Sequence, residues 1–88
     1  MEIYQLRYFA YAAKYENITM AAQELNVSQP SISKAIQSLE RELKTELLRK
    51  NGRSCVLTHD GYLLQERVVP LLEEIERLPL EFRNRQKK

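Results

Sequence analysis

The sequence predicts a mainly α-helical fold, with three helices, a short two-stranded β-hairpin and then a long fourth helix. Three observations support this fold class. Apolar residues recur at helical spacing, only two glycines and three prolines interrupt the 88 residues, and one Asn-Gly pair separates two strand-like runs. A chain of this length is expected to form one small domain with a limited core, which often needs a partner for stability.

The first helix is predicted over residues 3–15, which carry two stripes. The apolar stripe consists of Leu6, Phe9, Ala10 and Ala13. The aromatic stripe consists of Tyr4, Tyr8, Tyr11 and Tyr15. A helix with two such faces usually packs on two elements, so the tyrosines are expected to contact a second copy of the chain. Partly exposed tyrosines are the alternative.

Two further helices are expected around a tight turn. Thr19 is the expected cap of a short helix from Met20 to Leu25. Ser28 is the expected cap of a longer helix from Gln29 to about Leu43, whose first turn tolerates Pro30. The apolar stripe of this longer helix consists of Ile32, Ala35, Ile36, Leu39 and Leu43. Its polar side carries Gln29, Ser33, Lys34, Gln37 and Arg41.

A β-hairpin is predicted after the third helix. Asn51-Gly52 separates the runs 47–50 and 53–57, and this dipeptide is the strongest short signal for a hairpin turn. Lys50 and Arg53 flank the turn, so the hairpin tip is expected to be basic.

The last helix is predicted to begin after Thr58 as its cap. It carries a heptad-like seam of Leu64, Val68, Leu71, Ile75, Leu78 and Phe82. Spacings that alternate between 4 and 3 residues are typical of a helix that pairs with another helix. Pro79 is expected to end the regular part, and residues 83–88 are expected to fray.

Positive charge is concentrated in the middle third of the chain. Residues 1–27 have two basic and three acidic groups, residues 28–57 have six and three, and residues 58–88 have six of each. The net charges are therefore −1, +3 and 0, which add up to the total of +2. A local excess of this kind fits a polyanionic ligand, although an ordinary solvated surface is the alternative.

The order helix, short helix, three-residue turn and longer helix, over about residues 18–37, is that of a helix-turn-helix, and the hairpin adds a wing. The start of the second helix of this motif enters the major groove of DNA. The predicted DNA-binding residues are Ser28, Gln29, Pro30, Ser31, Ser33, Lys34 and Gln37, with Arg53 on the wing. Capping and surface roles are the alternative for Gln29 and Ser33.

Other classes of function are not favoured. Cys55 is the only cysteine, which excludes an internal disulfide, and it is expected to be buried as a small apolar group. His59, Asp60 and Ser54 do not form a catalytic set, and no metal site or cofactor is expected. No run is long and apolar enough for a membrane span, and a cytoplasmic location is expected.

Several runs resemble the amino-terminal domain of LysR-type transcriptional regulators, over residues 1 to about 65. They are Leu6-Arg7-Tyr8-Phe9, Asn17 to Leu25, Val27 to Ile36 with the specific Ser-Gln-Pro-Ser-Ile-Ser segment, Leu39-Glu40, Leu47-Leu48-Arg49, and Leu57 to Gly61. The resemblance implies a bacterial winged helix-turn-helix (residues 1–58) that binds a partly palindromic operator in double-stranded DNA, with residues 59–88 as a linker helix for dimerisation. The matching positions Gln29, Pro30, Ser31, Ser33 and Lys34 approach bases and phosphates in the family, and Arg53 matches the minor-groove position.

The resemblance also implies an antiparallel homodimer. Its predicted interface consists of Tyr4, Tyr8, Tyr11, Leu64, Val68, Leu71, Ile75 and Leu78. Regulators of this family are longer, and their effector domain binds a small-molecule inducer and drives tetramer assembly. That domain is absent from these 88 residues, so the chain is expected to be a fragment that does not sense an inducer.

Three positions depart from the family pattern. Lys34 stands where arginine is common, so a bidentate guanine contact is lost and phosphate binding is expected instead. Lys44 replaces a common glycine in the turn after the third helix, and Leu48 replaces a common phenylalanine in the core. A winged-helix protein-interaction module without DNA binding is the alternative function.

Overall fold

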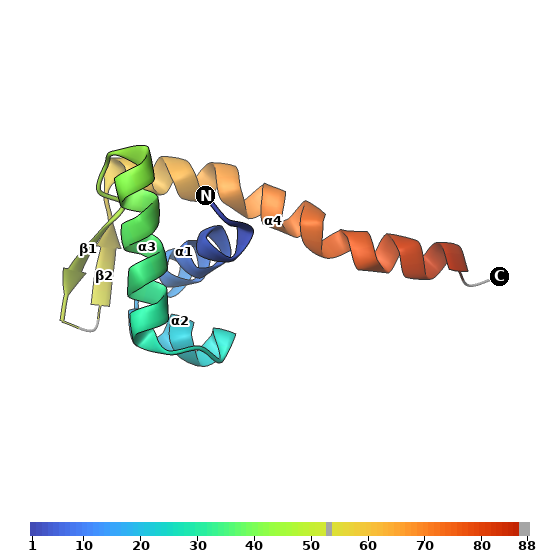
Figure 1. Ribbon diagram of the computed structural model, residues 1–88, viewed down its shortest axis with the longest axis horizontal. Helices are drawn as coiled ribbons and strands as arrows, with labels where there is room; N and C mark the ends of the chain where they lie inside the picture. Colours follow the sequence, from blue (N-terminus) through green and yellow to red (C-terminus); the bar gives the residue numbers. More distant parts are fainter. Residues whose placement is uncertain (53, 87–88) are drawn as a thin grey trace.

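The computed structural model describes residues 1–52 and 54–86, which form an elongated molecule of 52 × 25 × 17 Å. The elements are α1 (Ile3–Tyr15), α2 (Ile18–Leu25), α3 (Gln29–Leu43), β1 (Leu48–Asn51), β2 (Ser54–Leu57) and α4 (His59–Gln86). The first three helices and the hairpin form a compact head, and α4 begins in this head and extends far beyond it (Figure 1). The predicted fold class is confirmed.

The core of the head joins α1, α2, α3 and the hairpin. Its largest fully buried side chains are Phe9, Ile32, Leu39, Leu47 and Cys55. The predicted stripe of α3 is buried as expected, except that Leu43 remains 39% exposed because it is the last residue of the helix. Burial raises the pKa of the Cys55 thiol, and the nearby Glu16 carboxylate adds to this shift, so the cysteine is a neutral core group.

The caps of the short helices differ in part from the prediction. Helix α2 begins at Ile18 because the Asn17 side chain accepts a hydrogen bond from the Met20 N–H at 2.9 Å. The predicted cap at Thr19 is therefore wrong, and Asn17 has the capping role. The predicted cap at Ser28 is confirmed, since its hydroxyl accepts from the Ser31 N–H at 3.2 Å.

Lys44 ends α3 in the left-handed conformation, with φ 57° and ψ 42°. A side chain in this conformation costs roughly 1–2 kcal/mol relative to glycine. The departure at this position therefore leaves a turn of the kind that glycine adopts most easily, at some cost in stability.

The hairpin differs from the prediction by one residue. Asn51 is the last residue of β1 and pairs with Ser54, so Asn51 belongs to the strand and is not a turn residue as predicted. Gly52 has φ +67°, which is the positive φ that such a turn requires. Arg53 lies outside the described residues. Leu48 is buried in the core cluster, as its position predicted.

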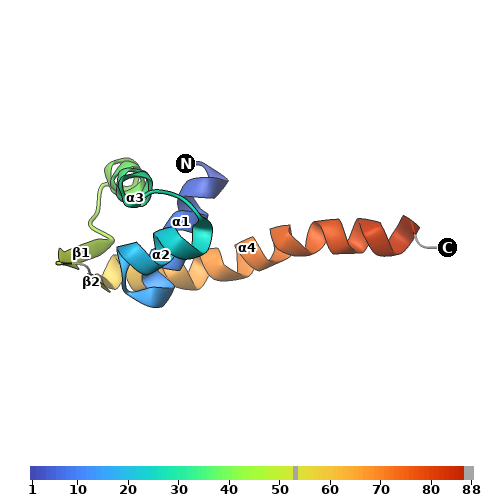
Figure 2. The same ribbon diagram turned by 90° about the horizontal axis from the view of Figure 1, so that it is seen from below.

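Helix α4 is longer and more regular than predicted. The Thr58 cap is confirmed, because its hydroxyl accepts from the Gly61 N–H at 3.0 Å. The helix then continues through Pro70 and Pro79 to Gln86, and Figures 1 and 2 show it without interruption. The predicted end at Pro79 and fraying of residues 83–86 are wrong, since a proline removes one backbone donor but its φ is compatible with a helix.

Within the described residues, no helix combines the length and apolarity needed to cross a membrane.

Candidate nucleic-acid interface

The first half of α3 is a solvent-exposed polar surface. Gln29, Lys34 and Gln37 are exposed, whereas Ile32 and Ile36 on the opposite side are buried in the core. The periodicity of the sequence predicts this division, because residues three and four apart share a face of a helix. In Figure 2, α3 is seen nearly end-on at the edge of the head, with its outer side uncovered.

The small side chains at the start of α3 allow a ligand to approach the helix backbone closely. Ser28, Gln29, Pro30 and Ser31 are all exposed, and all of them except Gln29 have small side chains. The hydroxyls of Ser28 and Ser31 lie 2.8 Å apart, and Ser28 also caps the helix. Since the cap occupies the Ser31 N–H and Pro30 has none, few backbone donors at this helix start are available for a phosphate.

The hairpin lies beside the first half of α3 (Figure 1). The Lys50 ammonium on β1 donates a hydrogen bond to the Ser33 hydroxyl on α3 at 2.9 Å. A cleft of about 220 Å³ separates the two elements, lined by Ile18, Ser33, Ile36, Gln37, Glu40, Leu48 and Lys50. The structure thus joins Ser33, a predicted site residue, to Lys50, which was not predicted to have a specific contact.

Glu40 attaches the base of the hairpin to α3. One of its carboxylate oxygens accepts from the Leu47 N–H at 2.8 Å and from the Leu48 N–H at 3.3 Å. Hydrogen bonds to a charged acceptor are stronger than neutral ones, so Glu40 helps to set where β1 starts relative to α3. This role of Glu40 was not predicted from the sequence. The available signal was an acidic residue on the half-buried side of a helix in the basic third of the chain.

A buried glutamine connects α1 to α3. Gln5 donates from its amide nitrogen to the Ser38 hydroxyl at 3.3 Å, and its amide oxygen accepts from the Glu2 N–H at 2.9 Å. Buried polar groups need such partners, which restricts how α3 can rotate on the core. Sequence patterning alone does not reveal this contact.

Several exposed basic groups surround the α3 and hairpin surface. Lys34 and Lys50 are exposed there, and Arg49 is exposed but pairs with Glu46 at 3.3 Å. The predicted wing residue Arg53 has no described position. The surface therefore combines small polar side chains on a helix with lysines on both neighbouring elements, which suits a polyanion better than an apolar partner.

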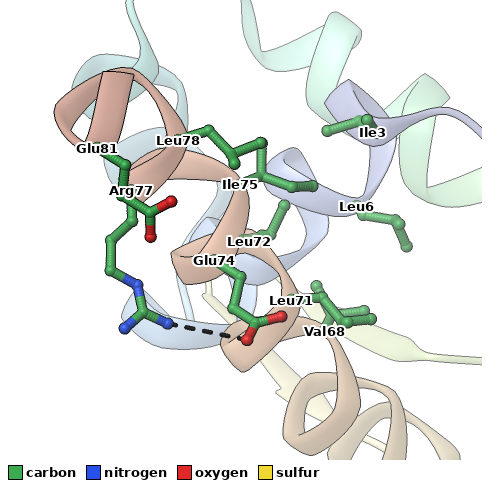
Figure 3. Close-up of a pocket in the computed structure, with 10 residues that line it drawn as sticks. All are labelled: Ile3, Leu6, Val68, Leu71, Leu72, Glu74, Ile75, Arg77, Leu78 and Glu81. Carbon is green, nitrogen blue, oxygen red and sulfur yellow. Dashed lines mark ion pairs between the residues drawn. The ribbon is translucent and has the colours of Figure 1, made fainter. Parts of the chain in front are cut away.

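A second surface is an apolar groove between the start of α1 and the middle of α4, with a volume of about 600 Å³ (Figure 3). Its lining residues are Ile3, Leu6, Val68, Leu71, Leu72, Glu74, Ile75, Arg77, Leu78 and Glu81. Leu71 is 56% exposed, Leu78 is also exposed and Ile75 is half-buried, so these three predicted interface residues border an open groove.

The other predicted interface residues have different surroundings. Val68 is only 3% exposed and packs with Ala10 and Leu72, so the chain itself already covers it. This turn of α4 lies directly against α1, and Val68 also lines the groove, so its place in the dimer interface stays a prediction. Leu64, Tyr8 and Tyr11 are half-buried against the core. Tyr4 is exposed, and its ring packs edge-on against the Tyr8 ring with 5.4 Å between the ring centroids.

Comparison with known proteins assigns the family. The family model described as "Bacterial regulatory helix-turn-helix protein, lysR family" matches residues 3–62. The probable cat1 operon transcriptional activator of Acinetobacter lwoffii is 40% identical over 78 residues, which are 89% of this chain and 26% of that protein. The regulator BudR of Raoultella terrigena is 49% identical over 61 residues, which are 69% and 21% respectively. The chain thus spans about a quarter of the length of these relatives.

Solved structures with the same fold include two complexes with DNA. The BenM DNA-binding domain in complex with catB site 1 DNA has a TM-score of 0.90 and 30% identity, and the match covers 100% of this chain and 98% of that one. The CbnR DNA-binding domain in complex with DNA has a TM-score of 0.85 and 36% identity, with 99% and 100% covered. With a family model over most of its length and relatives in several bacteria, the chain belongs to the LysR family of bacterial regulatory helix-turn-helix proteins.

Proposed function

We propose that this chain binds double-stranded DNA in a sequence-specific manner, as the DNA-binding part of a cytoplasmic transcriptional regulator. The observation that carries the proposal is the exposed polar first half of α3, which carries Lys34 and lies beside a hairpin that carries Lys50. An α-helix of this kind fits the major groove, and a hairpin beside it reaches the neighbouring backbone. The similarity to DNA-bound domains over the whole chain supports the same function.

The predicted DNA-binding residues have proposed roles. The Gln29 amide can pair with an adenine edge, while Pro30 and Ser31 allow close approach of the backbone to DNA. Lys34 is a point charge, so it binds a phosphate rather than a guanine edge. Ser28 caps the helix, and its contact with DNA is secondary. Gln37 lies about one helical turn after Lys34 on the same exposed side and is proposed to contact DNA there. Arg53 remains a predicted wing contact.

We also propose that two copies act together. The open groove of Leu71, Ile75 and Leu78 extends along α4, and Tyr4 offers further exposed aromatic surface on α1. A small domain gains stability when such apolar surface is covered by a second copy. In this proposal, residues 1–58 bind DNA and residues 59–88 pair the copies. A longer regulator would add tetramer assembly and an inducer site outside these residues.

Gln29→Ala and Lys34→Ala are expected to weaken DNA binding in different ways. Loss of the Gln29 contact should cost roughly 1–3 kcal/mol at one base pair and relax specificity there. Loss of the Lys34 charge should weaken binding to all sequences and reduce the slope of log affinity against log salt by about 0.9. Fluorescence anisotropy with a duplex selected from random sequences, and with its single-base-pair variants, measures both effects.

Lys14→Ala is the charge-matched control, since Lys14 is an exposed lysine on α1, outside α3 and the hairpin, with its ammonium 5.3 Å from the centroid of the Tyr15 ring. It should leave affinity and slope nearly unchanged. Normal binding by both α3 variants would contradict the proposed interface. If the wild-type chain shifted no duplex at low salt, a protein-interaction module would be the better explanation.

A further inference from the structure

Lys50 occupies an unusual position on the hairpin. It pairs directly with Cys55 in the antiparallel register, and it shares a face of β1 with Leu48 because side chains alternate along a strand. Cys55 and Leu48 are buried in the core. Lys50 therefore lies on the same inward-facing side of the hairpin as Leu48 and Cys55, but nearer the tip. An apolar residue would be the usual choice on this side, and the chain has a lysine there.

The Lys50 side chain spans the opening between hairpin and helix. Its ammonium nitrogen lies 2.9 Å from the Ser33 hydroxyl oxygen, at one end of the cleft that the two residues help to line. An ammonium group only donates, so the Ser33 oxygen is the acceptor and two N–H groups of Lys50 are left over. Lys50 is exposed whereas Ser33 is half-buried, so these two donors are accessible from solvent.

We propose that Lys50 binds a DNA phosphate at the junction of α3 and the hairpin, and that Ser33 is the positioning residue that orients it. The inference rests on the proposed function. If α3 lies in the major groove and the hairpin lies over the neighbouring minor groove, the sugar-phosphate backbone between the grooves must cross this junction. A lysine held by Ser33 meets that backbone with less loss of side-chain freedom than an untethered one.

This assignment changes the role of Ser33. As a helix residue near the start of α3, it was predicted to approach bases and phosphates directly. The Ser33 oxygen accepts from Lys50 and keeps its own O–H as a donor. In this proposal, Ser33 acts on affinity through the lysine and does not distinguish base pairs. Phosphate contacts carry no direct sequence information, so the two roles have different signatures.

Lys50→Met tests the phosphate contact, because methionine keeps an unbranched apolar stem without the charge. The salt slope of duplex binding should fall by about 0.9, so between roughly 50 and 200 mM salt the variant should lose about 3.5-fold less affinity than the wild type. Lys50→Arg should restore the wild-type slope. Lys14→Met, which removes the same charge from α1, should not change it, and thermal unfolding verifies that each variant is folded.

Ser33→Ala tests the positioning role on the same selected duplex and its single-base-pair variants. It should lower affinity roughly threefold for all sequences alike, the size of one exposed charged contact. In the Lys50→Met background it should have no further effect. A loss of discrimination at one base pair, or equal losses in both backgrounds, would show that Ser33 reads DNA independently and would overturn the proposal.

The failure of this inference is distinguishable from the failure of the proposed function. If the wild type binds duplexes and Lys34→Ala reduces the slope while a folded Lys50→Met variant does not, only the Lys50 assignment is wrong. If the wild type binds no duplex at low salt, the proposed function fails first, and the Lys50 assignment fails with it.

Discussion

Replacing Gly61 by alanine is expected to lower the free energy of unfolding by about 3 kcal/mol, the upper end of the usual cost of overpacking. A glycine-to-alanine substitution within a helix usually stabilises a protein by about 1 kcal/mol, so the destabilisation expected here has the opposite sign. For a domain of this size, the melting temperature should fall by about 12–24 °C.

The reason is the close approach of α4 to the segment before β1. A Cβ at position 61 would lie 2.2 Å from the Leu47 carbonyl oxygen and 3.0 Å from a Leu57 methyl carbon. The first contact is with backbone, so a side-chain rotation cannot relieve it. The same carbonyl accepts from the N–H of Thr58, the cap residue of α4, at 3.0 Å, and any shift would weaken this bond.

Gly52→Ala is the matched control for this prediction. Its added Cβ has no atom within 4 Å, and only its φ of +67° opposes the substitution. We expect a loss of roughly 1 kcal/mol from this conformational strain. Thermal unfolding followed by circular dichroism at one fixed protein concentration compares the two variants, since the proposed dimerisation would make the melting temperature depend on concentration. A Gly61→Ala variant that melts at or above the wild-type temperature would contradict the described packing.

The double variant Leu71→Asp with Ile75→Asp is expected to convert the proposed dimer into a monomer. Both side chains line the open groove, and each would place a carboxylate in an apolar interface. Desolvation of a charge costs several kcal/mol, so the dissociation constant should rise roughly 1000-fold or more. Sedimentation equilibrium should show about half the wild-type mass, and affinity for a two-fold symmetric duplex should fall with it.

Val69→Asp with Leu80→Asp is the control on the opposite side of α4. Leu80 is 52% exposed and Leu71 is 56% exposed, so the two sites are similarly accessible in the single chain. Nine residues separate them, which places them half a turn apart around a helix with 3.6 residues per turn. The control should remain a dimer. Dissociation by both double variants, or by neither, would be inconsistent with pairing through the α1–α4 groove.

Much of the fold follows from local patterns that sequence analysis can interpret. The stripe of Ile32, Ala35, Ile36 and Leu39 predicted both the extent of α3 and the side that is buried. The same periodicity identified the exposed side that carries Gln29 and Lys34. These predictions succeeded because a helix repeats every 3.6 residues whatever it packs against.

The errors arose where tertiary contacts decide between equal local choices. Asn17 and Thr19 are both good caps, and Asn17 was favoured because Ile18 then starts the helix and reaches the core. Val68 belongs to the seam by spacing, and the spacing alone did not reveal that it also packs against α1 within the same chain. Glu40 and Lys50 bond residues of a neighbouring element, across the turn after α3, so the periodicity of a single helix or strand does not reveal their partners.

The central claim is that the first half of α3 is the surface that meets DNA. A residue-resolved NMR titration of the chain with its selected duplex tests it most directly. We expect the largest changes in amide chemical shift at residues 28–37 and in β1 and β2, and little change at residues 73–86. Changes confined to α1 and α4, with the amides of α3 unaffected, would contradict it.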